Sequence, residues 1–156
     1  MSIYTVEVVW ERGDQDFLDR RYSRRHLIRF DGGAQLVGSS SPAVVPVPQS
    51  DAAGVDPEEA FVASLSGCHM LWFLDIAARQ GLLVDRYEDR PSGVLERNAM
   101  GRHAMTRVTL RPRVQFAGAE APAAEQLAAL HSQAHEHCYI ANSVTTAVTV
   151  EPAPDS

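Results

Sequence analysis

The chain contains two cysteines, Cys68 and Cys138, and each lies at a distinctive place. Cys68 lies well inside a predicted helix, and Cys138 ends a second predicted helical segment. A thiolate is a nucleophile, and two thiols that meet can form a disulfide. The pattern therefore predicts either a redox pair or two small buried hydrophobic residues, and the bare residues leave both alternatives open.

A reactive Cys68 needs a cation beside it, because it lies too far from the N-terminus of its helix for the helix dipole to stabilise a thiolate. The chain has no lysine, so an arginine is the expected cation, and Glu58 is a candidate to hold it by a bidentate ion pair. An Arg-rich run near the N-terminus supplies five candidates: Arg20, Arg21, Arg24, Arg25 and Arg29. The charged edge of a solvated hairpin explains this run equally well.

Histidines gather near the second cysteine. His131 and His135 stand four residues apart, on one face of the second predicted helix. Further ligands of the type that zinc prefers are His69, His137 and the two cysteines. The spacing is weakly specific, since no CxxC or HExxH motif occurs. A solvated histidine face is therefore the alternative to a zinc site.

The composition describes a soluble globular protein of one domain, residues 1–156. Hydrophobic residues make up 45% of the 156 residues and charged residues 22%. The net charge of −6 argues against a nucleic-acid partner, and the absence of lysine excludes Schiff-base chemistry. We expect no signal peptide, no membrane span and a cytoplasmic location, where a structural disulfide is uncommon.

The first half of the chain predicts an antiparallel meander followed by a helix. The expected strands are residues 4–10, 26–30 and 34–37, with a turn at 31–33. The proline-rich residues 39–54 form a long loop, long enough to act as a functional cover. Asp56 is a good N-cap, Glu59 completes a capping box, and Gly81 ends a helix that runs to about residue 80. Recurring apolar residues place Cys68 on the inward face of that helix.

The second half predicts more strands and a second helix. The expected strands are residues 82–87, 93–100, 105–116 and 143–150, and the expected helix is 123–137. Pro112 indicates an edge or a bulge. Gly67, inside the first helix, indicates a close approach to the backbone. The order βββ-α-βββ-α-β defines an α+β fold, with antiparallel sheets packed against two main helices.

Two segments resemble the OsmC/Ohr family, the osmotically induced and organic-hydroperoxide-resistance proteins. The segment Asp-Pro-Glu-Glu-Ala-Phe-Val-Ala-Ser-Leu-Ser-Gly-Cys, residues 56–68, resembles the family's first cysteine segment. The segment Ala-His-Glu-His-Cys-Tyr-Ile-Ala-Asn-Ser, residues 134–143, resembles its second. The strand and helix order along essentially the whole chain also agrees.

This resemblance implies an intertwined homodimer that reduces organic hydroperoxides with thiols, without a metal or an organic cofactor. Cys68 would be the peroxidatic cysteine, and Cys138 the resolving cysteine that forms a disulfide with it. Glu58 would pair with the activating arginine, for which Arg24 is favoured and Arg21 comes second. An external dithiol, of lipoyl type, would reduce the disulfide.

Three features depart from the family's pattern and predict a divergent branch. His69 follows Cys68 where an apolar residue is usual, Tyr139 follows Cys138 where many members have proline, and residues 39–54 form an insertion. Two other kinds of function remain as alternatives. One is a non-catalytic redox-sensing or ligand-binding module on the same fold, and the other is a zinc-binding protein that uses Cys138 and the nearby histidines.

Overall fold

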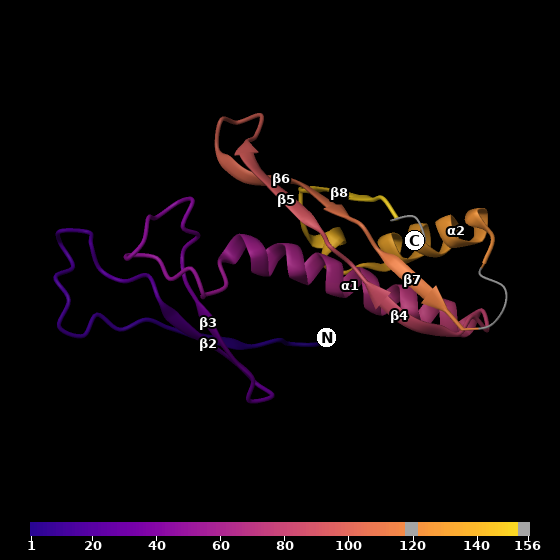
Figure 1. Cartoon of the computed structure of the whole chain (residues 1–156), viewed down its shortest axis with the longest axis horizontal. Helices are drawn as coiled ribbons and strands as arrows, with labels where there is room; N and C mark the ends of the chain where they lie inside the picture. The colour runs from indigo at the N-terminus through magenta and orange to yellow at the C-terminus, as the bar shows by residue number, and fades with distance from the viewer. Residues whose placement is uncertain (118–121, 153–156) are drawn as a thin grey trace. The chain divides into compact units, whose positions relative to one another are not determined.

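The computed structural model describes residues 1–117 and 122–152, which form two compact units. The first unit comprises residues 1–60 and the second residues 61–156, so the boundary falls inside the first helix. Figure 1 shows the helices and strands along the chain. Within these described residues the class is α+β, as predicted, with two α-helices, one short 3₁₀ helix and three small sheets.

The first unit holds an antiparallel sheet in the order β1-β2-β3, which is the meander that the sequence predicts. Its strands are β1 (Val6–Val9), β2 (His26–Phe30) and β3 (Gln35–Gly38). Gly33 makes the turn between β2 and β3 with φ of +88°, a conformation that glycine adopts without strain. None of the hydrophobic side chains of residues 1–60 is fully buried.

The proline-rich residues 39–54 form a loop with neither helix nor strand, as predicted. Backbone and side-chain bonds hold it in place. The amide of Asp51 donates to the buried hydroxyl of Ser39 at 2.8 Å, and the amide of Ser39 donates to the carbonyl of Val55 at 3.1 Å. The amide of Arg24 donates to the carbonyl of Gln49 at 2.7 Å, which connects the loop to the segment before β2.

The first helix, α1 (Pro57–Arg79), begins with the predicted capping box. The amide of Glu59 donates to Asp56 Oδ1 at 2.7 Å, and the amide of Asp56 donates to Glu59 Oε2 at 3.2 Å. These reciprocal bonds satisfy backbone donors that the first helical turn leaves unpaired. Gly81, with φ of +75°, ends the helix as predicted.

The buried face of α1 differs from the predicted one. Its buried residues are Leu65, His69, Phe73, Ile76 and Ala77. The stripe is therefore centred one residue after Cys68, and Cys68 lies at its edge, half-buried. By length and composition α1 could cross a membrane, as buried core helices of soluble proteins also could.

The second unit contains the second helix, α2 (Ala124–His137), and a short 3₁₀ helix, η1 (Ala141–Ser143). Its strands are β4 (Val84–Glu88), β5 (Ser92–Arg97), β6 (His103–Leu110), β7 (Arg113–Phe116) and β8 (Ala147–Val150). β4 pairs with β7, and β5, β6 and β8 form the other sheet.

Two strand predictions need correction. The single strand expected over residues 105–116 is split into β6 and β7, because Pro112 lacks the amide hydrogen that a continuous ladder requires. The last strand is shorter than expected, since η1 occupies its beginning, and it pairs parallel to β6 rather than antiparallel.

The buried hydrophobic side chains of the described chain all belong to the second unit. One cluster packs α1 against α2 and β7 through Phe73, Leu130, Ala134 and Val114. A second cluster packs Leu65 of α1 against β6. This packing fixes the middle of α1, where Cys68 lies, against the helix that Cys138 ends.

We expect Asp56→Ala to lower the free energy of unfolding by about 1 kcal/mol, because it removes the side-chain acceptor of the α1 capping box. Urea unfolding followed by circular dichroism measures the change. Asp14→Ala is the control, since Asp14 is exposed and outside the helix. An equal loss in both variants would contradict the assigned role of the cap.

Candidate functional site

Cys68 opens onto an apolar cavity of about 510 Å³ in the second unit. The cavity is lined by Ser64, Cys68, Leu71, Trp72, Asp75, Arg79, Tyr139 and Ile140. Six of these residues come from one face of α1, and the other two directly follow Cys138. Trp72 and Tyr139 meet edge to face, with ring centroids 5.5 Å apart. A molecule with an apolar body can therefore reach the Cys68 thiol here.

Cys138 caps the end of α2 and is buried, with 1% of its surface exposed. Its sulfur accepts the amide hydrogen of Ala141, N to Sγ 3.4 Å. Burial, and then a hydrogen bond with the neighbouring Cys68 thiol, raise the pKa of the Cys138 thiol to about 11. The fold thus brings both cysteines together as free thiols.

The two cysteines differ in exposure, and the difference separates what each can do. Cys68 is half-buried at the cavity wall, whereas Cys138 is covered and held neutral by its surroundings. An entering electrophile therefore meets Cys68 first. Cys138 lies beside it as a neutral thiol that can react with an oxidised Cys68.

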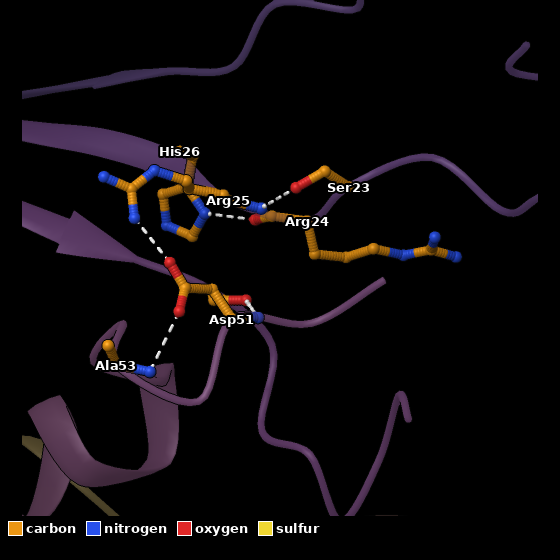
Figure 2. A network of polar contacts seen from close by, with 7 residues as sticks. Ser23, Arg24, Arg25, His26, Asp51 and Ala53 are labelled. Atoms are coloured by element: carbon orange, nitrogen blue, oxygen red, sulfur yellow. Dashed lines mark hydrogen bonds and ion pairs between the residues drawn. The ribbon is translucent and has the colours of Figure 1, made fainter. Parts of the chain in front are cut away.

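The structure does not pair Arg24 with Glu58. The guanidinium of Arg24 donates to the carbonyls of Tyr22 and Arg20, the latter at 2.8 Å, and lies 3.9 Å from the centre of the Tyr22 ring. Its side chain extends away from the neighbouring Arg25–Asp51 pair, as Figure 2 shows. Within residues 1–60, no arginine lies within ion-pair distance of Glu58 in the single chain.

Two of the five candidate arginines already have carboxylate partners. Arg25 pairs with Asp51, and Arg29 pairs with Glu7 at 2.8 Å. The amide of Ala53 and then Arg25 lower the pKa of Asp51, so this carboxylate stays charged. Arg24 and Arg21 make no ion pair within the described residues, which keeps both as candidates for the activating cation.

A buried histidine pair joins the two helices that carry the cysteines. His69 Nε2 lies 3.0 Å from His131 Nδ1, and the two rings are nearly parallel, at 11°, with centroids 5.3 Å apart. The Phe73 ring stacks on the His131 ring, with centroids 4.5 Å apart. Sequence reasoning missed this pair and treated both histidines as metal ligands or surface residues. The one available signal was the 3–4 spacing of His69 with Leu65, Phe73 and Ile76.

Both imidazoles are neutral at physiological pH. Burial lowers the pKa of His69 to about 4, with a further decrease from His135 and an opposing effect of Asp89. Burial, and then His69, lower the pKa of His131 to about 4. A neutral pair shares one hydrogen between the two facing nitrogens, which a doubly charged pair could not do.

The residues proposed for zinc do not form a metal site. Throughout residues 1–117 and 122–152, no three His, Cys, Asp or Glu side chains lie close enough together to hold a metal ion. The nitrogen of His131 nearest to α1 is already used by His69. Asp75, near the cysteine cavity, forms an ion pair with Arg79 at 2.8 Å.

The family comparison agrees with this fold. Residues 49–153 match the model of the OsmC-like protein family, well over half of the chain. The chain therefore belongs to the OsmC-like family. No curated protein matches the sequence.

Among solved structures, an OsmC-like protein of unknown function from Vibrio cholerae is 51% identical, with a TM-score of 0.96 over 98% of this chain and all of that one. The organic hydroperoxide resistance protein OhrB of Bacillus subtilis has a TM-score of 0.68 at 20% identity, covering 97% of this chain and 98% of its own. One from Legionella pneumophila has a TM-score of 0.67 at 15% identity, covering 99% and 100%. The last two similarities show the shared fold.

The histidine pair makes stability depend on pH. Above pH 6.5 the imidazoles are neutral in both the folded and the unfolded chain, so stability is at its full value. As the pH falls from 6.5 to 4, the unfolded chain takes up protons that the folded chain does not, and stability is lost. One such histidine lowers the free energy of unfolding by about 3 kcal/mol when the pH falls through this range. Urea unfolding at several pH values between 4 and 7.5 measures this loss.

We expect the dependence of stability on pH to weaken in His131→Gln. The variant lacks one of the two titrating imidazoles, and His69 loses its contact with that ring. His103→Gln is the matched control, since His103 is exposed. A His131→Gln protein whose stability falls between pH 6.5 and 4 as steeply as that of the wild type would contradict the assignment.

Proposed function

We propose that the protein is a thiol-dependent peroxidase that reduces organic hydroperoxides. The observation that carries this proposal is the position of Cys68 at the wall of an apolar cavity, with the buried Cys138 thiol beside it. Membership of a family that includes organic hydroperoxide resistance proteins supports it.

In the proposed reaction the Cys68 thiolate attacks the terminal oxygen of the hydroperoxide. The O–O bond breaks, Cys68 becomes a sulfenic acid, and the alkoxide takes a proton and leaves as an alcohol. The Cys138 thiol then attacks the Cys68 sulfur, a disulfide forms and water leaves. An external dithiol, for which a lipoyl-type compound is proposed, reduces the disulfide and restores both thiols.

We further propose that the active form is a homodimer in the cytoplasm. The sheet of the first unit buries no hydrophobic side chain fully, and Val6 and Val8 of β1 are 56% and 62% exposed. Beside Cys68, Leu71 and Tyr139 are 65% and 67% exposed. Apolar surfaces of this kind gain stability when a second chain covers them. A Cβ at Gly67 would meet nothing within 4 Å in the single chain, so a close approach there would also come from a second chain.

We expect Cys68→Ser to reduce turnover of cumene hydroperoxide with dihydrolipoamide by more than about 100-fold, because the nucleophile is removed. Cys138→Ser is the matched variant, since it keeps Cys68 and removes only its partner. In that variant the first oxidation proceeds, and mass spectrometry then finds sulfinic acid on Cys68. Full peroxidase activity in Cys68→Ser would exclude the proposal. Stoichiometric oxidation of the wild type without turnover would favour a redox sensor instead.

We expect Arg24→Met to slow oxidation of Cys68 at pH 7 by about 10- to 100-fold, because Arg24 is proposed to stabilise the thiolate with the help of Glu58. Arg25→Met is the control, because its guanidinium already pairs with Asp51. Stopped-flow tryptophan fluorescence measures the rate constant. If Arg21→Met slows the reaction and Arg24→Met does not, the activating role belongs to Arg21.

A further inference from the structure

A second cavity, of about 280 Å³, lies between α2 and β8 in the second unit. It is lined by Ala128, His131, Ser132, His135, Val148, Val150 and Pro152 and shares no residue with the Cys68 cavity. Its walls are mainly apolar, with two imidazoles from successive turns of α2. The proposed peroxidase reaction makes no use of it.

The two imidazoles carry unused hydrogen-bonding atoms. His131 is 4% exposed, its Nδ1 faces His69, and its Nε2 is buried without a hydrogen-bond partner within the described residues. His135 Nδ1 is likewise buried and unpartnered in that part of the chain. A buried polar atom without a partner costs about 1–3 kcal/mol, so such atoms are uncommon unless something binds them.

The His131 ring is fixed in place, which is what a binding site requires. Its Nδ1 is held by His69 at 3.0 Å, and its face stacks on Phe73 at 4.5 Å. The ring therefore cannot turn to find another partner without breaking both contacts. Its Nε2 lies on the side of the ring turned away from His69.

The chemistry of the lining selects the class of ligand. The lining contains no Arg, Asp or Glu, and the low pKa of His131 keeps that ring neutral, so these mainly apolar walls favour an uncharged ligand over a charged one. A metal ion would have only two protein nitrogens here, fewer than protein zinc sites use. A hydroxyl group accepts from one imidazole and donates to another, and it suits either tautomer of the histidine pair.

We propose that the α2–β8 cavity binds a small, uncharged organic molecule that carries a hydroxyl group. The hydroxyl bonds to His131 Nε2 and His135 Nδ1, and an apolar body packs against Val148 and Val150. The volume, near the lower limit for ligand pockets, suits a molecule of about ten non-hydrogen atoms. This site is separate from the thiol chemistry and does not depend on it.

The test uses the full chain with ¹⁵N-labelled histidine, titrated with benzyl alcohol and, in parallel, with toluene, which has the same ring without the hydroxyl. We expect the ring-nitrogen resonances of His131 and His135 to move saturably with benzyl alcohol, and the affinity for toluene to be at least about 10-fold weaker. The indole N–H proton resonance of Trp72, observed in the ¹H spectrum of the same sample, reports separately on any binding in the Cys68 cavity.

Ala128→Phe fills the cavity from its exposed rim and should abolish the histidine shifts. Ala129→Phe is the matched control. Ala129 is the next residue on α2 and is exposed like Ala128, but it does not line the cavity. His135→Phe is a second variant. It leaves the His69–His131 bond in place and should lower the affinity for benzyl alcohol by at least about 10-fold. Equal affinity for toluene, no saturation, or unchanged binding in Ala128→Phe would overturn the proposal. Peroxidase activity bears on none of these outcomes.

Discussion

The packing of α1 against α2 is the constraint on which the site depends. The two cysteines are 70 positions apart in the chain, and each belongs to a different helix. Phe73 and Ala134 supply the apolar part of the contact, and the His69–His131 bond supplies its polar part. His69 directly follows Cys68, and His131 precedes Cys138 by seven residues, which is two helical turns. A shift of one helix along the other would therefore break the histidine bond and separate the thiols together.

A buried polar pair contributes specificity at some cost in stability. An apolar contact between α1 and α2 tolerates sliding, because leucine or phenylalanine packs acceptably in several registers. The imidazole pair does not, since its 3.0 Å bond forms in one register and leaves unpaired buried nitrogens in the others. The depressed pKa values of His69 and His131 show the cost, because both rings give up their protonated forms in order to be buried. The arrangement places Cys68 accurately where packing alone would allow several positions.

The sequence predicted the parts of this structure that depend on local chemistry. The capping box of Asp56 and Glu59, the turn at Gly33 and the end of α1 at Gly81 each follow from neighbouring residues, and the structure has all three. Both cysteines were found for the same reason, since each belongs to a recognisable segment. The buried face of α1 was placed one residue early, because apolar periodicity counted Cys68 as core and His69 as polar. A histidine is buried only when it has a partner, and that partner lies 62 residues away.

The activating arginine shows the other limit of sequence reasoning. Which guanidinium meets a given carboxylate depends on the register of a hairpin and on the partners already bound. In the first unit Arg25 and Arg29 are engaged by Asp51 and Glu7. Arg24 donates only to backbone carbonyls and the Tyr22 ring, neither of which neutralises its charge. A cation held by neutral acceptors attracts an anion with its full charge. A cation paired to a carboxylate attracts an anion much less, because the carboxylate offsets its charge. Arg24 and Arg21 both keep this attraction, since neither makes an ion pair within the described residues, and the proposal of Arg24 over Arg21 rests on its position in the sequence.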